Sequence, residues 1–217
     1  DQPRSRGLGD VYKRQVWQAR EVDGALVLTH VSPDGDEGFP GTLEVRVTYS
    51  LSADGVLMLD YWAKSDADTL CNLTNHSYFN LLGHDAGTLA GQQVEIFADA
   101  ITQTDESSTP TGALLPVEGT PFDLRRPRDF LEGLAMDHPQ LALGNGYDHN
   151  FVLHTAPISP LSLAARVSGG GLVLECLTTQ PGLQLYTANY LDGTPGKGGT
   201  AYGPRSAFCL ETQNWPD

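Results

Sequence analysis

The sequence predicts an all-β protein whose strands form a large antiparallel β-sandwich. Its apolar residues recur mainly with a period of two, which is typical of half-buried strands. The 217 residues include 24 glycines and 14 prolines, and this content indicates many tight turns. Hydrophobic residues make up 40% of the chain, so one domain can bury a sizeable core.

Ten segments combine this alternation with the β-branched and aromatic residues that favour strands. The predicted strands are Ala25–His30, Thr42–Tyr49, Val56–Trp62, Leu70–Asn80, Gln93–Ala98, Asn150–His154, Leu161–Val167, Leu172–Thr178, Leu183–Ala188 and Ala207–Thr212. Turn sequences rich in Gly, Asp and Pro separate them, as at 32–41 and 192–199. Only Asp129–Met136 is predicted to be helical. The segment 99–124 has a weak strand pattern and is predicted to be a long ordered loop, of the kind that often borders a binding site.

Charge and composition argue against several classes of partner. The chain has 27 acidic and 13 basic side chains, a net charge of −14. The phosphate backbone of a nucleic acid would repel a protein with this negative charge, and no nucleic-acid partner is therefore expected. No stretch approaches the ~20 apolar residues that cross a bilayer, so no membrane partner is expected. Cys71, Cys176 and Cys209 lie in apolar stretches and are predicted to be buried free thiols of a reducing compartment, which indicates the cytoplasm.

The stretch NLTNHSYFNL, residues 72–81, contains the most informative polar pattern. Alternation along a strand would place Asn72, Thr74, His76, Tyr78 and Asn80 on one face. Amides hydrogen-bond sugar hydroxyls, aromatic rings cover the C–H faces of sugars, and histidine exchanges protons near neutral pH. The pattern predicts a carbohydrate-binding surface, although a polar outer face of an edge strand fits it equally well.

Three further polar residues are placed unusually. Asp148 follows an Asn-Gly turn at the mouth of a predicted strand, and Gln180 precedes a Pro-Gly turn. Glu211 lies within the apolar strand FCLETQ, where glutamate is a poor strand former, so it faces either solvent or a cleft. Asp148 could equally accept backbone hydrogen bonds in its turn. The His, Cys and acidic residues lack the spacing of a metal site, so no metal or cofactor is predicted.

Six segments, in a single order, resemble the aldose 1-epimerase (galactose mutarotase) family. They are SPDGDEGFPG (32–41), NLTNHSYFNL (72–81), FDLR (122–125), GYDHNF (146–151), TTQPG (178–182) and LETQNWPD (210–217). The resemblance covers residues 16–217 and implies the family's fold. That fold is a large antiparallel β-supersandwich, incomplete here, with the active site in a groove on its concave face.

The resemblance also implies the reaction and its residues. His76 resembles the general acid and Glu211 the general base, while Tyr78, Asp148 and Gln180 fall in sugar-binding stretches. The implied reaction interconverts the α and β anomers of free aldoses such as galactose and glucose, without a cofactor. Glu211 would take the proton of the anomeric hydroxyl while His76 protonates the ring oxygen, and the ring would open and close again. A small monosaccharide is the expected partner of a monomer or weak dimer.

The sequence departs from the family pattern at both ends. Family members carry an Asn-Arg pair and a Leu-His-Gly stretch upstream of the matched region, and closing strands after its end. Residues 1–15 supply neither motif and are expected to be a non-matching leader, disordered or artefactual, before a partial domain at 16–217. Because part of the sugar clamp and the closing strands are missing, we expect weak or absent activity from this chain.

Three other functions are compatible with these residues. A glycoside hydrolase would use Glu211 and Asp148 as its two carboxylates and would release reducing sugar from glycosides. A non-catalytic sugar-binding domain would keep its affinity after His76→Asn or Glu211→Gln. A sugar-phosphate epimerase would place basic residues in its cleft, and basic residues are scarce in this sequence.

Overall fold

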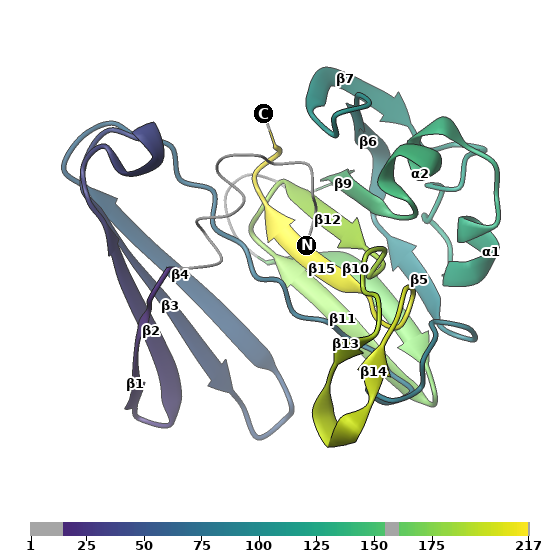
Figure 1. Ribbon diagram of the computed structural model, residues 1–217, viewed down its shortest axis with the longest axis horizontal. Helices are drawn as coiled ribbons and strands as arrows, with labels where there is room; N and C mark the ends of the chain where they lie inside the picture. The colour runs from purple at the N-terminus through teal and green to yellow at the C-terminus, as the bar shows by residue number, and fades with distance from the viewer. Residues whose placement is uncertain (1–14, 155–160, 217) are drawn as a thin grey trace. The chain divides into compact units, whose positions relative to one another are not determined.

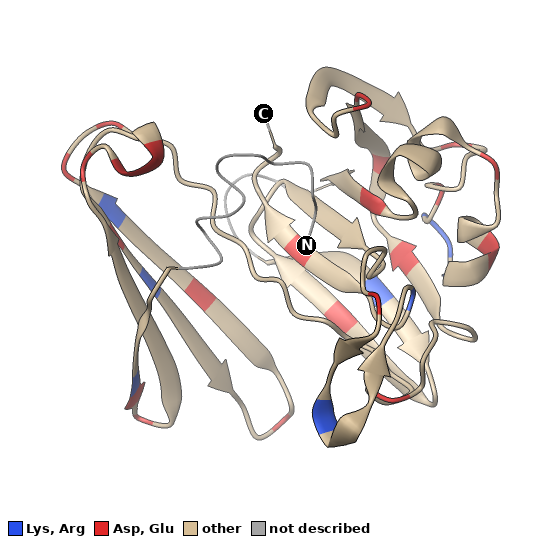
Figure 2. Ribbon diagram, viewed as in Figure 1, with Lys and Arg blue, Asp and Glu red and all other residues tan. Residues whose placement is uncertain are grey.

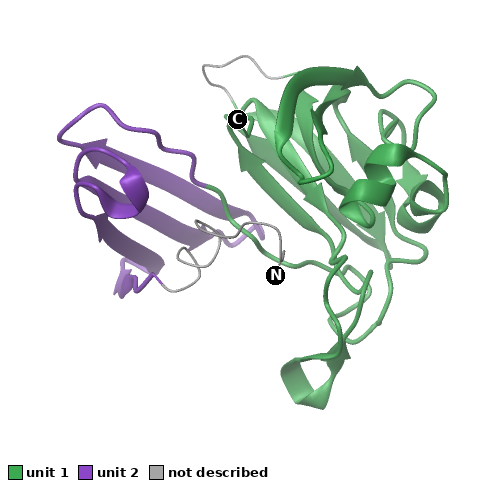
Figure 3. Cartoon of the chain, turned by 45° about the horizontal axis from the view of Figure 1, so that its top comes forward, with its two compact units in different colours: residues 1, 74–217 green, residues 2–73 purple. Residues whose placement is uncertain are grey.

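The computed structural model describes residues 15–154 and 161–216, which belong to two compact units (Figure 3). Unit 2 comprises residues 2–73, and unit 1 comprises residue 1 and residues 74–217. All but the last residue of the predicted leader, 1–15, lies outside the described residues, so that part of the domain assignment stays a prediction.

Unit 2 is a four-stranded antiparallel sheet in the order β1-β2-β3-β4. Its strands are β1 (Gln18–Val22), β2 (Ala25–Ser32), β3 (Leu43–Leu51) and β4 (Leu57–Ser65), with the 3₁₀ helix η3 (Asp36–Gly38) between β2 and β3. The β1–β2 hairpin turns through Asp23 and Gly24, both with positive φ, which is the conformation that an Asp-Gly hairpin turn requires. Strands predicted at 25–30, 42–49 and 56–62 are confirmed.

Unit 1 contains two antiparallel sheets and confirms the predicted all-β, sandwich-like class (Figure 1). One sheet has the order β11-β10-β5-β8, and the other has the order β15-β12-β9-β6-β7. The strands are β5 (Gln93–Ile96), β6 (Ala98–Thr104), β7 (Pro110–Pro116), β8 (Arg128–Asp129), β9 (Asp148–Leu153), β10 (Ser162–Gly169), β11 (Leu172–Thr178), β12 (Gly182–Tyr186) and β15 (Cys209–Gln213). A hairpin of β13 (Thr194–Pro195) and β14 (Ala201–Tyr202) encloses the 3₁₀ helix η4 (Lys197–Gly199).

The core of unit 1 joins its two sheets. A single buried cluster includes Val94 and Val167 from one sheet and Phe151, Leu183 and Leu185 from the other, each at most 1% exposed. Each such side chain contributes roughly 1.5–3 kcal/mol through burial. Because the core takes one face of the five-stranded sheet, the residues between these apolar positions project from the opposite face.

Aromatic contacts show how the side chains of residues 147–151 alternate between two faces. The Phe122 ring packs against Tyr147, His149 and Phe151, with centroids 5.7, 4.6 and 6.3 Å away. All three side chains therefore lie on the core side of β9. Asp148 and Asn150 project on the other side.

The strand predicted at 70–80 is wrong. Only Phe79 pairs through its backbone, in an isolated bridge with Phe208. Side chains satisfy neighbouring backbone groups instead, since Asn80 Oδ1 accepts from Leu82 N and Gln92 Oε1 accepts from Leu81 N. Asn and Gln side chains compete in this way with a sheet ladder.

Other sequence predictions met mixed outcomes. The predicted helix is confirmed as the shorter α1 (Phe130–Leu134), and a second helix, α2 (Pro139–Gly144), was missed. The loop predicted at 99–124 is wrong, because β6 and β7 occupy much of it; β7 begins and ends in proline, as an edge strand can. The buried position predicted for Cys71 is also wrong, since this thiol is exposed, whereas Cys209 is buried.

Phe208 is a direct test of this packing. Its fully buried ring stacks on Phe130 at 5.3 Å and lies 5.9 Å from Phe79. We expect Phe208→Ala to lower the free energy of unfolding by about 3–5 kcal/mol, because it leaves a cavity. Leu172→Ala, at a position 57% exposed in β11, should cost about 0.5 kcal/mol. Urea denaturation followed by circular dichroism measures both, and equal costs would contradict the packing described.

Candidate active site

The candidate site is built on the face of β9, β12 and β15 that points away from the core. These three strands are neighbours, and their register places polar residues directly opposite one another in two adjacent rows. The rows are Asp148–Tyr186–Cys209 and Asn150–Gln184–Glu211. Directly paired residues project on the same side of a sheet, so all six side chains share this face.

The segment 74–79 runs antiparallel along β15, the edge strand, and carries His76 to this face. At one end, Thr74 Oγ1 donates to Thr212 O at 2.9 Å. At the other end, Phe79 and Phe208 exchange backbone hydrogen bonds of 2.8 and 2.9 Å. The segment is thus fixed on both sides of His76.

His76 contacts two residues of β15. Its Nε2 lies 3.7 Å from Glu211 Oε1, and its Nδ1 lies 3.4 Å from Cys209 Sγ. The His76 side chain is 48% exposed, whereas that of Glu211 is only 11% exposed. The structure therefore brings the predicted acid and base together. His76 lies on the solvent-exposed side of the site, and Glu211 lies on its buried side.

Two tyrosines stand beside the histidine. The ring of Tyr78 lies 4.8 Å from that of His76, and Tyr186 lies 5.6 Å from His76 and 6.3 Å from Tyr78. Tyr78 is 45% exposed. The cluster offers an aromatic surface, with polar groups attached, next to the pair. The sequence had not assigned Tyr186 to the site.

Asp148 joins the site through Gln184, whose Nε2 donates to Asp148 Oδ1 at 2.8 Å. Gln184 was missed by the sequence analysis, although a glutamine between Leu183 and Leu185 in a buried strand is the same signal that marked Glu211. Asn150 was not among the predicted site residues either. It is 2% exposed, and its Nδ2 has no hydrogen-bond partner within the described part of the chain.

Gln180 is less directly connected to the pair. It lies between β11 and β12, where its backbone N–H donates to Thr178 Oγ1 at 3.0 Å. The next carbonyl, that of Pro181, accepts from Trp215 Nε1 at 3.0 Å. A side chain at Gly182 would collide with the Trp215 ring and the Asn150 amide, so glycine leaves room for both. Gln180 thus lies at the Gly182 end of the polar face.

Asn80 does not contribute to a sugar-binding surface, contrary to the sequence prediction. Its Nδ2 donates to the carbonyls of Thr88 and Ser206, and its Oδ1 accepts from Gln92 and from Leu82 N. These hydrogen bonds occupy the amide, so Asn80 is a structural residue.

Burial decides the protonation of the acid–base pair. Desolvation, together with the smaller effect of the negative charge of Asp148, raises the pKa of Glu211 from 4.5 to about 8. Desolvation lowers the pKa of His76 below its ordinary value of 6.5. At neutral pH both groups are therefore uncharged. Together they hold one transferable proton, on Glu211.

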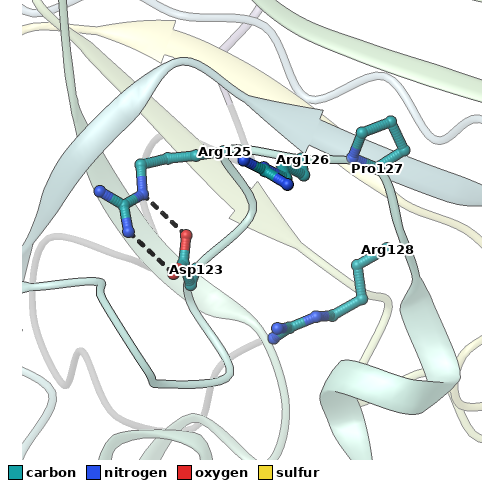
Figure 4. A pocket seen from close by; sticks show the side chains of 5 residues that line it. All are labelled: Asp123, Arg125, Arg126, Pro127 and Arg128. Carbon is teal, nitrogen blue, oxygen red and sulfur yellow. Dashed lines mark hydrogen bonds and ion pairs between the residues drawn. The ribbon is translucent and has the colours of Figure 1, made fainter.

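A separate hollow of about 460 Å³ is lined by Asp123, Pro127 and the three arginines 125, 126 and 128 (Figure 4). Arg125 is paired with Asp123 and Asp99, while Arg128 donates to the carbonyls of Thr120 and Pro121. Two of the three arginines thus interact with neighbouring groups of the protein itself. None of the residues that line the hollow is a histidine, so it offers no imidazole–carboxyl pair, and we do not assign the site to it.

Acidic side chains are scattered over both units, with few basic ones among them (Figure 2). Within residues 15–154 and 161–216, His76 and Glu211 have no lysine or arginine among their hydrogen-bond or ion-pair partners. Neither member of the acid–base pair is therefore bound by one of the cations that a sugar-phosphate epimerase would use to hold its substrate's phosphate.

Comparison with known proteins decides the family. The sequence model for aldose 1-epimerase matches residues 8–217 of this chain. The chain belongs to the aldose 1-epimerase family. Its sandwich fold is the family's fold as well, because the galactose 1-epimerase structure from Lactobacillus acidophilus NCFM superposes on it with a TM-score of 0.79 at 29% sequence identity. That match covers 93% of this chain and 58% of the other.

Two curated relatives place the chain within this epimerase family. Galactose mutarotase from Sus scrofa is 45% identical over 207 residues, which are 95% of this chain and 59% of the pig protein. Aldose 1-epimerase from Haemophilus influenzae is 38% identical over 215 residues, 96% of this chain and 61% of that protein. The chain thus spans about three-fifths of the length of these epimerases. Among its described residues, no helix is long and apolar enough to cross a bilayer.

The protonation of this candidate site can be measured directly. We expect NMR titration of a ¹³C-labelled Glu211 carboxyl to give a midpoint at about pH 8. Asp148→Asn should lower this midpoint, because removing a neighbouring negative charge favours the carboxylate. Asp105→Asn, in the exposed turn between β6 and β7, serves as the matched control and should leave it unchanged. A midpoint near 4.5, or one that Asp148→Asn does not lower, would contradict the account.

Proposed function

We propose that the protein interconverts the α and β anomers of free aldoses such as galactose and glucose. The observation that carries this proposal is the 3.7 Å separation between Nε2 of the half-exposed His76 side chain and Glu211 Oε1. Membership of the aldose 1-epimerase family and 45% identity to a protein named galactose mutarotase support the reaction type.

The separation suits the chemistry of ring opening. The anomeric hydroxyl and the ring oxygen are bonded to the same carbon, so a base and an acid that lie close together can each reach one of them. Glu211 takes the proton from the hydroxyl while His76 delivers one to the ring oxygen, and closure after rotation about the bond to the carbonyl carbon reverses the two roles.

The proton needed for this step is already in the site. In the unliganded protein it lies on Glu211, because burial raises the pKa of this carboxyl to about 8. The assignment of His76 as acid requires that the proton reside on His76 when the sugar is bound. Transfer between the neighbouring Oε1 and Nε2 atoms supplies it, and leaves Glu211 as the carboxylate base.

The surrounding residues fit a neutral pyranose. Tyr78 and Tyr186 provide rings against which the C–H face of a sugar can lie. Asp148, oriented by Gln184, provides an acceptor for hydroxyl groups, and Gln180 lies toward the other end of the face. A small monosaccharide is therefore the partner, and the reaction requires no cofactor. Free cysteines are typical of a reducing compartment, which suggests that the reaction takes place in the cytoplasm. A monomer or weak dimer stays the expected state.

A glycoside hydrolase is the second candidate, since Asp148 and Glu211 interact electrostatically across the same face. Such enzymes place two carboxyls on opposite sides of the scissile bond, about 5–9.5 Å apart, so that each acts from its own side. Here an imidazole on a separate segment lies 3.7 Å from the Glu211 carboxyl. The pairing of one imidazole with one carboxyl favours the epimerase.

Polarimetry of freshly dissolved α-D-galactose tests the proposed function. We expect the 217-residue chain to accelerate mutarotation above the uncatalysed rate, because it holds an acid and a base side by side. His76→Asn and Glu211→Gln should each reduce the added rate by ~10²-fold or more, since each removes one proton-transfer group. His84→Asn, which alters a histidine outside the site that contacts Tyr202, is the matched control and should leave the added rate unchanged.

Two outcomes would contradict the proposal. Retained acceleration in both variants would exclude His76 and Glu211 as the acid and base. Release of reducing sugar from methyl galactoside would favour the hydrolase instead.

A further inference from the structure

Cys209 is a buried thiol that the proposed reaction does not use. It projects from β15 on the same face as Glu211, two residues away, and contacts the His76 ring at 3.4 Å. One nitrogen, one sulfur and one carboxylate oxygen from His76, Cys209 and Glu211 lie within 4.8 Å of one another. Sequence spacing could not reveal this set, because His76 is distant along the chain.

We propose that His76, Cys209 and Glu211 form a three-ligand site for a thiophilic divalent metal ion such as Zn²⁺, and that a bound ion excludes the sugar. Tetrahedral zinc with ligands at about 2.0–2.3 Å holds its ligand atoms about 3.4–3.6 Å apart. The three ligand atoms lie within 4.8 Å of one another, so they must move closer together to reach this spacing. The shortest contacts of the imidazole are 3.4 Å from Nδ1 to sulfur and 3.7 Å from Nε2 to oxygen.

Little rearrangement is needed to bring one nitrogen toward both partners. The two contacts use different ring nitrogens of His76, so the imidazole must turn to direct one nitrogen at a shared metal. The His76 side chain is half exposed, so its ring can turn about its side-chain bonds while the backbone stays in place. Cys209 and Glu211 are fixed on the strand, and a water molecule would complete the tetrahedron.

The donor set and the charge of the site determine which metal fits. Thiolate and imidazole favour zinc over magnesium or calcium, which prefer oxygen ligands. Binding displaces the protons of Cys209 and Glu211, and the metal charge compensates for the two anions formed. Asp148, which raises the pKa of both groups, contributes a further negative charge nearby.

Cobalt(II) provides a direct test, because a cobalt–thiolate bond has a characteristic near-ultraviolet charge-transfer band. We expect the 217-residue chain to bind one equivalent of Co²⁺ with this band, and Zn²⁺ to displace it. Cys209→Ser should abolish the band and weaken Zn²⁺ binding by at least ~10-fold, the lower end of the loss caused even by substitutions beyond the ligands. Cys71→Ser, at an exposed thiol, is the matched control and should retain both.

A second variant keeps the test decisive if Cys209→Ser does not fold. His76→Asn alters an exposed side chain and should also weaken Co²⁺ binding by at least ~10-fold. Absence of the band in the wild-type chain, its loss in Cys71→Ser, or unchanged affinity in His76→Asn would each overturn the site.

The inhibitory part rests on the proposed function and is tested separately. Stoichiometric Zn²⁺ should remove the added mutarotation rate, and a chelator should restore it. Metal binding without inhibition would overturn the claim that the ion excludes the sugar. A chain without mutarotase activity would contradict the proposed function, while the cobalt titration would still decide the metal site.

Discussion

The site depends on one short pairing, the backbone bridge between Phe79 and Phe208. Glu211 is fixed by the sheet itself, through its place in β15 opposite Gln184. His76 has no such ladder and is held over Glu211 by the bridge on one side and by the Thr74 hydrogen bond on the other. Because Phe208 also packs in the core of unit 1, the histidine is positioned by the same residues that stabilise the sandwich.

The second constraint is the burial of Glu211. A carboxyl in this position, near Asp148 and without a cationic partner in the described ranges, is mostly protonated at neutral pH. This arrangement costs stability, and such costs are common where a site must exchange protons. It also keeps a proton available next to the imidazole. The same burial maintains Cys209 as a thiol, so the chemistry of the site begins from neutral groups.

Much of the fold was predictable because each sheet has one core-facing side. Strands with regular alternation, such as Leu172–Thr178, were predicted with the bounds that the structure shows. The segment around His76 has the same alternation, and its faces were assigned correctly, with His76 and Tyr78 on one side and Phe79 on the other. The secondary structure of this segment was predicted wrongly. A strand requires a backbone partner along its length, and the presence of such a partner depends on residues distant in the chain.

The candidate site was predictable only in part, from polar residues that interrupt the apolar pattern of a strand. A glutamate inside an apolar strand is visible in the sequence. Its distance to a histidine on another segment depends on the register of β15, which no local pattern specifies. The resemblance to a family supplied that link, and the geometry is consistent with it. Cys209 was overlooked as a partner of His76, because a cysteine in an apolar strand is indistinguishable from a core residue.

The most direct test of the account is a crystal structure of the 217-residue chain with galactose. It should show the sugar ring against Tyr78, with its ring oxygen within hydrogen-bond distance of His76 Nε2 and its anomeric hydroxyl at the Glu211 carboxyl. A sugar bound elsewhere on the molecule, or one that contacts the face of β9, β12 and β15 with its first carbon directed away from both groups, would contradict it.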